Sequence, residues 1–181
     1  MSTNGEPVQI FTGTNFASEA EAMAYFDAEA DRSGCFRIYR EVPGEYFQPK
    51  IGCDDKAARI DRILLPNKKL TDAGWNLGPI GIEGKVSNVN KVISQALDYT
   101  RAIWFLPNCY EIHLRWIFLW PFDRQLGAIA SVMAQNRIGY VKAYKRTPLV
   151  FYNDATQVIT VWNDGKVTVA VPKSGNKVGS R

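Results

Sequence analysis

Two strand-like segments carry charged side chains that suit hydrolytic chemistry. Asp61 lies inside 57–65 (AARIDRILL), and Glu83 and Lys85 follow the run 80–82 (IGI). Side chains i and i+2 of a strand project from one face, so Glu83 and Lys85 are expected to point the same way. If the two strands pair as a hairpin, Asp61 joins them.

These three residues suit a hard metal ion and a phosphodiester. Mg²⁺ and Mn²⁺ prefer oxygen ligands, and one or two carboxylates completed by substrate phosphate commonly suffice. A lysine beside them can polarise an attacking water or neutralise charge that develops on a phosphate oxygen. A surface strand that carries a salt bridge is the simpler interpretation of the same residues.

The composition excludes most other metal chemistry. The 181 residues include one His, His113, and three Cys, at positions 35, 53 and 109. Sites built on two imidazoles, four-ligand zinc clusters and a disulfide framework are therefore excluded. His113 lies in an alternating apolar segment, and we expect it to be structural. We expect no organic cofactor.

Neither a secretory signal nor a membrane span is expected. Residues 1–13 lack a basic region followed by an apolar core, and the longest apolar stretch, 116–122, is too short to cross a bilayer. We expect a cytoplasmic protein of a bacterial or phage-infected cell, with no membrane partner.

The net charge of +4 is unevenly distributed. Residues 1–60 carry 6 basic and 10 acidic side chains, whereas residues 61–181 carry 16 and 8. A basic C-terminal part favours a polyanionic partner such as DNA, although basic faces also serve solubility and protect edge strands. The candidate DNA contacts are Lys91, Lys142, Lys145 and Arg146.

The hydrophobic pattern predicts one α/β or α+β domain in which helices pack on a sheet. The expected domain spans 18–171, between a loose segment 1–17 and a flexible basic tail 172–181. Helices are expected at 18–32, 88–105 and 123–136, and strands at 35–42, 57–65, 79–86, 110–120 and 139–144, followed by further strands around the turn 163–165 (NDG).

Two motifs resemble the PD-(D/E)XK nuclease superfamily. Asp61 and Glu83-Gly84-Lys85 are similar to its metal site, an Asp on one strand followed by Glu-x-Lys on the next. Gln95 and Tyr99 resemble the Q-x-x-x-Y helix motif of its RecB-like and phage lambda exonuclease-like branch. The resemblance covers about residues 18–120 and implies a restriction-endonuclease-like αβββαβ core, with extra C-terminal strands here.

The resemblance also implies roles for individual residues. Asp61, Glu83, the Gly84 carbonyl and Glu21 would hold the metal, with Glu19 and Glu41 as alternatives to Glu21. Lys85 would orient or deprotonate the attacking water, while Gln95 and Tyr99 would position the scissile strand. The Pro of the motif name is absent, because Ile60 precedes Asp61.

The leading hypothesis is therefore a Mg²⁺-dependent deoxyribonuclease, with Mn²⁺ as substitute, acting in DNA repair, recombination or phage DNA processing. The alternative is a non-catalytic nuclease-fold module that binds DNA or protein, and a weaker one is an RNA-directed hydrolase. Both exonuclease and endonuclease activity stay open, as does a homo-oligomer.

Overall fold

The computed structural model describes residues 16–48, 55–85, 89–108, 110–121, 128–142, 148–153 and 158–170. Within them lie four helices, α1 (Glu19–Ser33), α2 (Lys68–Asp72), α3 (Val89–Tyr99) and α4 (Ala128–Gln135). The strands are β1 (Phe36–Tyr46), β2 (Ala57–Pro66), β3 (Ile80–Gly84), β4 (Ala102–Leu106), β5 (Tyr110–His113), β6 (Trp116–Trp120), β7 (Ile138–Lys142), β8 (Leu149–Tyr152), β9 (Val158–Val161) and β10 (Val167–Ala170).

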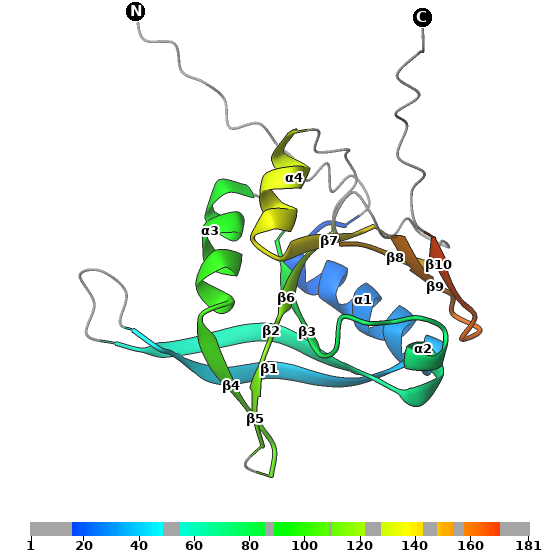
Figure 1. Ribbon diagram of the computed structural model, residues 1–181, viewed down its shortest axis with the longest axis horizontal. Coiled ribbons are helices and arrows are strands. Elements are labelled where there is room, and N and C mark those ends of the chain that lie inside the picture. The colour runs from blue at the N-terminus through cyan, green and yellow to red at the C-terminus, as the bar shows by residue number, and fades with distance from the viewer. Residues whose placement is uncertain are drawn as a thin grey trace, which may run out of the picture.

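The strands form one open, mixed sheet, in the order β10, β9, β8, β7, β6, β3, β2, β1, β4, β5 (Figure 1). Strands β1, β2 and β3 form an antiparallel meander, and β6 lies parallel to both β3 and β7. The remaining neighbours are antiparallel. The expected α+β class with a mixed sheet is confirmed.

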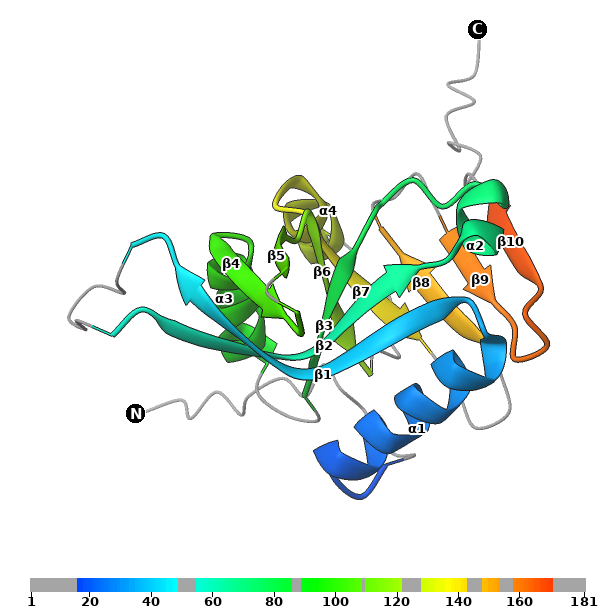
Figure 2. The same ribbon diagram turned by 90° about the horizontal axis from the view of Figure 1, so that it is seen from below.

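Helices cover both faces of this sheet, as Figure 2 shows for α1 on one side and α3 and α4 on the other. The first hydrophobic core includes Ala22 and Phe26 of α1. The second includes Val92 of α3 and Met133 of α4. We call these the α1 core and the α3 core.

Helix α1 has clear start and stop signals. The Ser18 hydroxyl accepts a hydrogen bond from the Glu21 N–H, and Gly34 ends the helix in the left-handed conformation at φ 61°. Both features provide hydrogen-bond partners for backbone groups that have none at the ends of a helix. Ala22, Phe26 and Ala30 recur every four residues and are fully buried, which holds α1 on the sheet.

Strands β1 and β2 exchange faces midway. The ladder pair Ile38 and Leu64 packs in the α1 core, whereas the pair Val42 and Ile60 packs in the α3 core. Residues four apart on a regular strand share a face, so both strands must twist between these pairs. Both strands thus contribute side chains to the α1 core and to the α3 core.

Glu41 and Asp61 lie opposite each other at this exchange, between the pairs Arg40–Arg62 and Val42–Ile60. Glu41 has a φ of 50°, which is uncommon for a residue with a side chain. The sequence places two carboxylates where the sheet passes from one helix layer to the other.

Several predicted boundaries were wrong. The predicted helix 88–105 ends at Tyr99, and 102–106 is strand β4, in which burial alternates and which pairs with β1 and β5. The predicted strand 110–120 is two strands, because β5 pairs with β4 whereas β6 pairs with β3. Local periodicity does not reveal such changes of partner.

Other differences are smaller. Strand β1 continues through Pro43-Gly44 to Tyr46, and the predicted loop after Pro66 contains α2, which Asn67 caps. The turn 163–165 joins β9 and β10 as predicted. Residues 123–127 of the predicted helix 123–136 and residues 143–144 of the predicted strand 139–144 lie outside the described residues, as do residues 1–15 and 171–181. No described helix combines the length and the apolar character needed to cross a membrane.

Candidate active site

Asp61 and Gly84 meet across β2 and β3. The antiparallel pairing brings the Gly84 N–H within 2.7 Å of Asp61 Oδ2, to which it donates a hydrogen bond. A Cβ on Gly84 would lie 2.4 Å from the Met23 sulfur and 3.3 Å from Asp61 Oδ2. Glycine thus lets the Met23 side chain of α1 and the Asp61 carboxylate both lie close to the end of β3.

Glu83 is buried on the opposite face of β3. Its neighbour Ile82 packs in the α1 core, so alternation directs Glu83 toward the α3 layer. The residue is 2% exposed, and Oε2 has no hydrogen-bond partner among the described residues. Oε1 lies 3.9 Å from Lys85 Nζ. A buried carboxylate with an unsatisfied oxygen is costly without a further positive partner.

The two carboxylates disfavour each other's ionisation. Burial, followed by the charge of Asp61, raises the pKa of Glu83 to about 8. Burial also raises the pKa of Asp61, although the Gly84 hydrogen bond opposes that rise. A proton or an added cation would relieve this excess of negative charge.

Lys85 links the site to α1. Its backbone N–H donates to the Trp120 carbonyl at 2.8 Å, and its Nζ donates to Glu19 Oε1 at 2.9 Å. Burial lowers the pKa of Lys85, but the hydrogen bond to Glu19 and the charges of Glu19, Glu83 and Asp61 outweigh it, so the net shift is upward. Lys85 is held as a cation at the two carboxylates.

Glu19 rather than Glu21 lies beside Lys85. The Glu21 carboxylate accepts a hydrogen bond from the Ala17 N–H at 2.7 Å, and its own N–H donates to Ser18 Oγ at 3.1 Å. Glu21 thus stabilises the start of α1, whereas Glu19, one of the two alternatives, is in contact with the site.

Glu41, the other alternative, borders a surface pocket of about 380 Å³ beside Asp61. Its carboxylate pairs with Arg59 Nε at 2.7 Å and with an Arg62 nitrogen at 3.5 Å. Its charge contributes to the raised pKa of Asp61. The pocket is lined by Glu19, Ala20, Met23, Ala24, Asp27, Glu41, Asp61 and Arg62.

Gln95 and Tyr99 bond to each other. The Gln95 amide donates to Tyr99 Oη, and this hydroxyl donates to the backbone carbonyl of Arg59, two residues before Asp61. Burial and then the charge of Glu83 raise the pKa of Tyr99. Tyr99 is therefore close enough to the site to respond to the charge of Glu83. The hydrogen bonds of Gln95 and Tyr99, in contrast, attach α3 to β2.

The candidate DNA contacts are not all beside these residues. Lys142 lies on β7, two positions along the sheet from β3, and its Nζ stands 5.9 Å and 5.3 Å from the ring centroids of Tyr140 and Tyr152. Lys91 is exposed on α3. Lys145 and Arg146 lie outside the described residues.

The sequence analysis missed an ion network under α1. Asp27 accepts from Arg62 at 2.8 and 3.1 Å and from Arg40 Nε at 2.8 Å. Arg62 also donates to the Asp61 carbonyl at 2.6 Å. The signal was present, since arginines alternate with apolar residues on both strands and Asp27 follows the buried Met23 by four residues, one helical turn.

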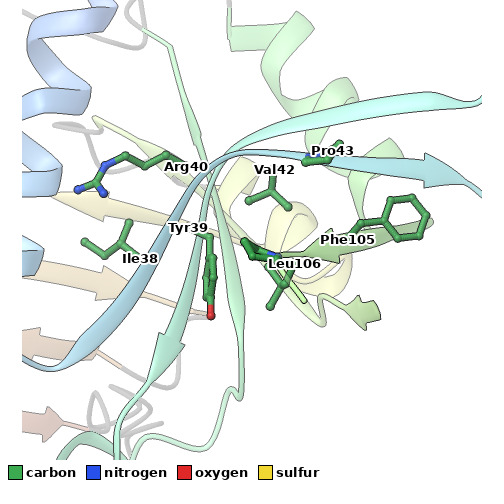
Figure 3. Close-up of a pocket in the computed structure, with 8 residues that line it drawn as sticks. Ile38, Tyr39, Arg40, Val42, Pro43, Phe105 and Leu106 are labelled. Carbon is green, nitrogen blue, oxygen red and sulfur yellow. The ribbon is translucent and has the colours of Figure 1, made fainter. Parts of the chain in front are cut away.

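A second pocket of about 430 Å³ lies between β1 and β4. Figure 3 shows Arg40 extending toward α1, away from Phe105 and Leu106. The lining of this pocket is mostly apolar and includes no carboxylate, so the pocket does not offer the groups for metal-dependent hydrolysis. The lining residues are Ile38, Tyr39, Arg40, Val42, Pro43, Phe105, Leu106 and Pro107.

Within the described part of the chain, no three His, Cys, Asp or Glu side chains are grouped as a metal-binding cluster. The site offers two carboxylates, which is the number that Mg²⁺ commonly takes from a protein when substrate and water supply the rest. The unsatisfied Oε2 of Glu83 and its raised pKa fit a cation in this place.

Comparison of the chain with protein-family models, with curated proteins and with solved structures found no match.

Proposed function

We propose that this protein is a metal-dependent deoxyribonuclease that hydrolyses DNA phosphodiester bonds. The observation that carries the proposal is the meeting of Asp61, Glu83 and Lys85. Asp61 Oδ2 accepts from the N–H next to Glu83, and Lys85 Nζ lies 3.9 Å from the Glu83 carboxylate. Two carboxylates with one lysine suit phosphodiester hydrolysis on a hard metal, because the carboxylates can hold the ion and the lysine can stabilise negative charge on the phosphate.

The topology supports the same proposal. Helix α1, the meander β1–β2–β3, helix α3 and strand β6 parallel to β3 follow the αβββαβ order that the resemblance implies. The β4–β5 hairpin is then an insertion between α3 and β6, and β7 to β10 extend the sheet. A restriction-endonuclease-like core is part of the proposal.

In this proposal, Asp61, Glu83 and the Gly84 carbonyl hold Mg²⁺ or Mn²⁺. When bound, the metal would polarise the phosphate and lower the pKa of a coordinated water. Glu83, buried with one unsatisfied oxygen, would provide negative charge once the proton that its raised pKa retains is displaced on metal binding, and the Gly84 N–H fixes the Asp61 carboxylate.

Lys85 is the residue that handles the water and the phosphate. Its ammonium group donates to Glu19 Oε1 at 2.9 Å and lies 3.9 Å from Glu83 Oε1, which fixes its position. A fixed ammonium donates hydrogen bonds to the attacking water or to a phosphate oxygen as negative charge develops. Gln95 and Tyr99 act through β2, because their polar atoms bond to each other and to Arg59.

A non-catalytic module that binds DNA or protein is the second candidate. Two observations favour it: Lys85 already has Glu19 as its ion-pair partner, and no described cluster supplies three side-chain ligands. This candidate predicts salt-sensitive binding that EDTA does not alter and that Glu83→Gln does not weaken.

The test is hydrolysis of linear, circular and branched DNA in Mg²⁺ or Mn²⁺, compared with EDTA. Asp61→Ala and Lys85→Ala are each expected to lower the cleavage rate by about a hundredfold or more, because each removes a group that stabilises the transition state. Cleavage that survives in either purified, folded variant would contradict the proposal, and an RNA substrate in the same assay tests the RNA-directed alternative.

A further inference from the structure

Glu41, which lines the pocket beside Asp61, forms an ion pair with Arg59. Arg59 Nε is 2.7 Å from Glu41 Oε2, and the two side chains are 70% and 50% exposed. Such exposed pairs contribute little to stability, because water and salt compete for both groups. The pair can therefore exchange partners at little cost.

Arg62, the second arginine near Glu41, has its main hydrogen bonds to other groups. Its guanidinium is about 10% exposed and bonds to both oxygens of Asp27 and to the Asp61 carbonyl, while its distance to Glu41 is 3.5 Å. Glu41 is consequently the main anionic partner of Arg59 and only a peripheral partner of Arg62.

The backbone directs Glu41 to this place. Its φ of 50° is sparsely populated by residues with side chains, and such outliers often occur where a side chain is held for a purpose. On the neighbouring strand, where Arg59 pairs with Pro43, the Tyr99 hydroxyl donates to the Arg59 carbonyl and fixes that backbone. Both partners thus have fixed main chains, whereas the arginine side chain is free to reorient.

We infer that the Glu41 carboxylate occupies the place of a nucleic-acid phosphate and that Arg59 binds the phosphate next to the scissile one. A phosphodiester presents the same charge and the same oxygen acceptors to a guanidinium as a carboxylate does. DNA binding then exchanges one ion pair for another, two residues from Asp61. This inference rests on the proposed function and extends it to substrate recognition.

The experiment measures equilibrium binding of a short DNA duplex in EDTA over a range of salt concentrations. Arg59→Gln is expected to weaken binding about threefold to tenfold and to lower the salt slope by about one, as for the loss of one phosphate contact. Glu41→Gln is expected to tighten binding by a similar factor, because the competing anion is gone. In the double variant the gain is lost, since the two side chains act on each other.

Matched controls separate this exchange from a general charge effect. Asp31 is also an exposed carboxylate paired with an arginine, Arg40, so Asp31→Asn removes the same charge. Arg37→Gln is the control for Arg59→Gln, because it also removes one exposed arginine charge. If Glu41→Gln binds no tighter than Asp31→Asn, if Arg59→Gln behaves like Arg37→Gln, or if the protein does not bind DNA, the inference is overturned.

The binding assay is independent of catalysis. Cleaved DNA without the Glu41 effect would overturn the inference and leave the proposed nuclease intact. The expected binding differences without any cleavage in Mg²⁺ or Mn²⁺ would support the phosphate contact and contradict the nuclease.

Discussion

Two clusters of charged side chains lie on either side of the Asp61 backbone, and their charges are balanced differently. In the network under α1, the Asp27 carboxylate meets two guanidinium groups, from Arg40 and Arg62. In the candidate active site, the charge of a second carboxylate, Asp61, raises the pKa of Glu83, and the Lys85 ammonium lies 3.9 Å from the Glu83 carboxylate.

The comparison separates structural charge from functional charge. Buried charges are tolerated when each is paired and hydrogen-bonded, as the Asp27 network is. The pair Asp61–Glu83 is short of positive charge, and burial holds the pKa of Glu83 at about 8. An uncompensated buried carboxylate destabilises the fold, so its presence suggests that a cation or a proton completes the site.

The largest expected contrast is in activity, between two buried glutamates. Glu83→Gln is expected to lower DNA cleavage in Mg²⁺ by about a thousandfold, because it removes a charge at the reacting centre. Glu29→Gln is the matched control: Glu29 is also buried, but it lies on α1 and is paired with Arg32. Both cleavage rates are measured at the same concentration of folded protein. An equal loss of cleavage in both variants would contradict the distinction between structural and functional charges.

The next contrast is in stability. Arg62→Met leaves the partly buried Asp27 with one partner fewer, and we expect the free energy of unfolding to fall by about 3 kcal/mol. Arg40→Met, at a more exposed arginine, is expected to cost less than about 1 kcal/mol. Urea denaturation of both variants measures the difference. Similar costs would mean that the burial of Arg62 does not matter.

The pH dependence of stability gives a third contrast. The pKa of Glu83 rises from its ordinary value of 4.5 to about 8 on folding, so the folded state binds this proton more tightly than the unfolded chain does. Its contribution favours folding at low pH and is lost as the pH rises from about 4.5 to about 8. Relative to Glu83→Gln, the wild type should lose about 2 to 3 kcal/mol between about pH 5.5 and 7.5.

A divalent cation provides the control for that measurement. If the site takes a metal, Mn²⁺ should raise the melting temperature of the wild type more at high pH than at low pH, because the ionised carboxylates bind it. Glu83→Gln should show little of this effect. A wild type whose stability relative to Glu83→Gln is flat with pH would show that Glu83 is not held by burial as described.

The parts of the site that could be predicted are those that local pattern determines. The alternation in 57–65 and 79–86 predicts two strands, and their antiparallel pairing brings Asp61 to Gly84. The Ser18 cap similarly defines the start of α1. In each case the deciding interactions involve residues close in sequence or one strand away.

The rest depends on contacts between distant segments. The choice of Glu19 over Glu21 depends on how α1 lies against the end of β3, and one helical position separates the two outcomes. The division of 88–105 into α3 and β4 depends on β1 as a partner for β4. Neither partner is visible in the local pattern, which explains why the predicted helix 88–105 was wrong, whereas a metal-binding role for Glu21 stays a prediction.

The smallest expected effect distinguishes two roles for Tyr99. The sequence motif predicts a role in the active site, whereas its hydrogen bonds indicate that it attaches α3 to β2. Tyr99→Phe removes the hydroxyl between Gln95 and the Arg59 carbonyl, and we expect a loss of about 1 kcal/mol of stability. Since no reacting group bonds to this hydroxyl among the described residues, the cleavage rate should fall less than about tenfold. Urea denaturation and single-turnover cleavage measure the two effects. A fall as large as that of Lys85→Ala would move Tyr99 from the scaffold into the catalytic group, because loss of one backbone contact on β2 does not account for it.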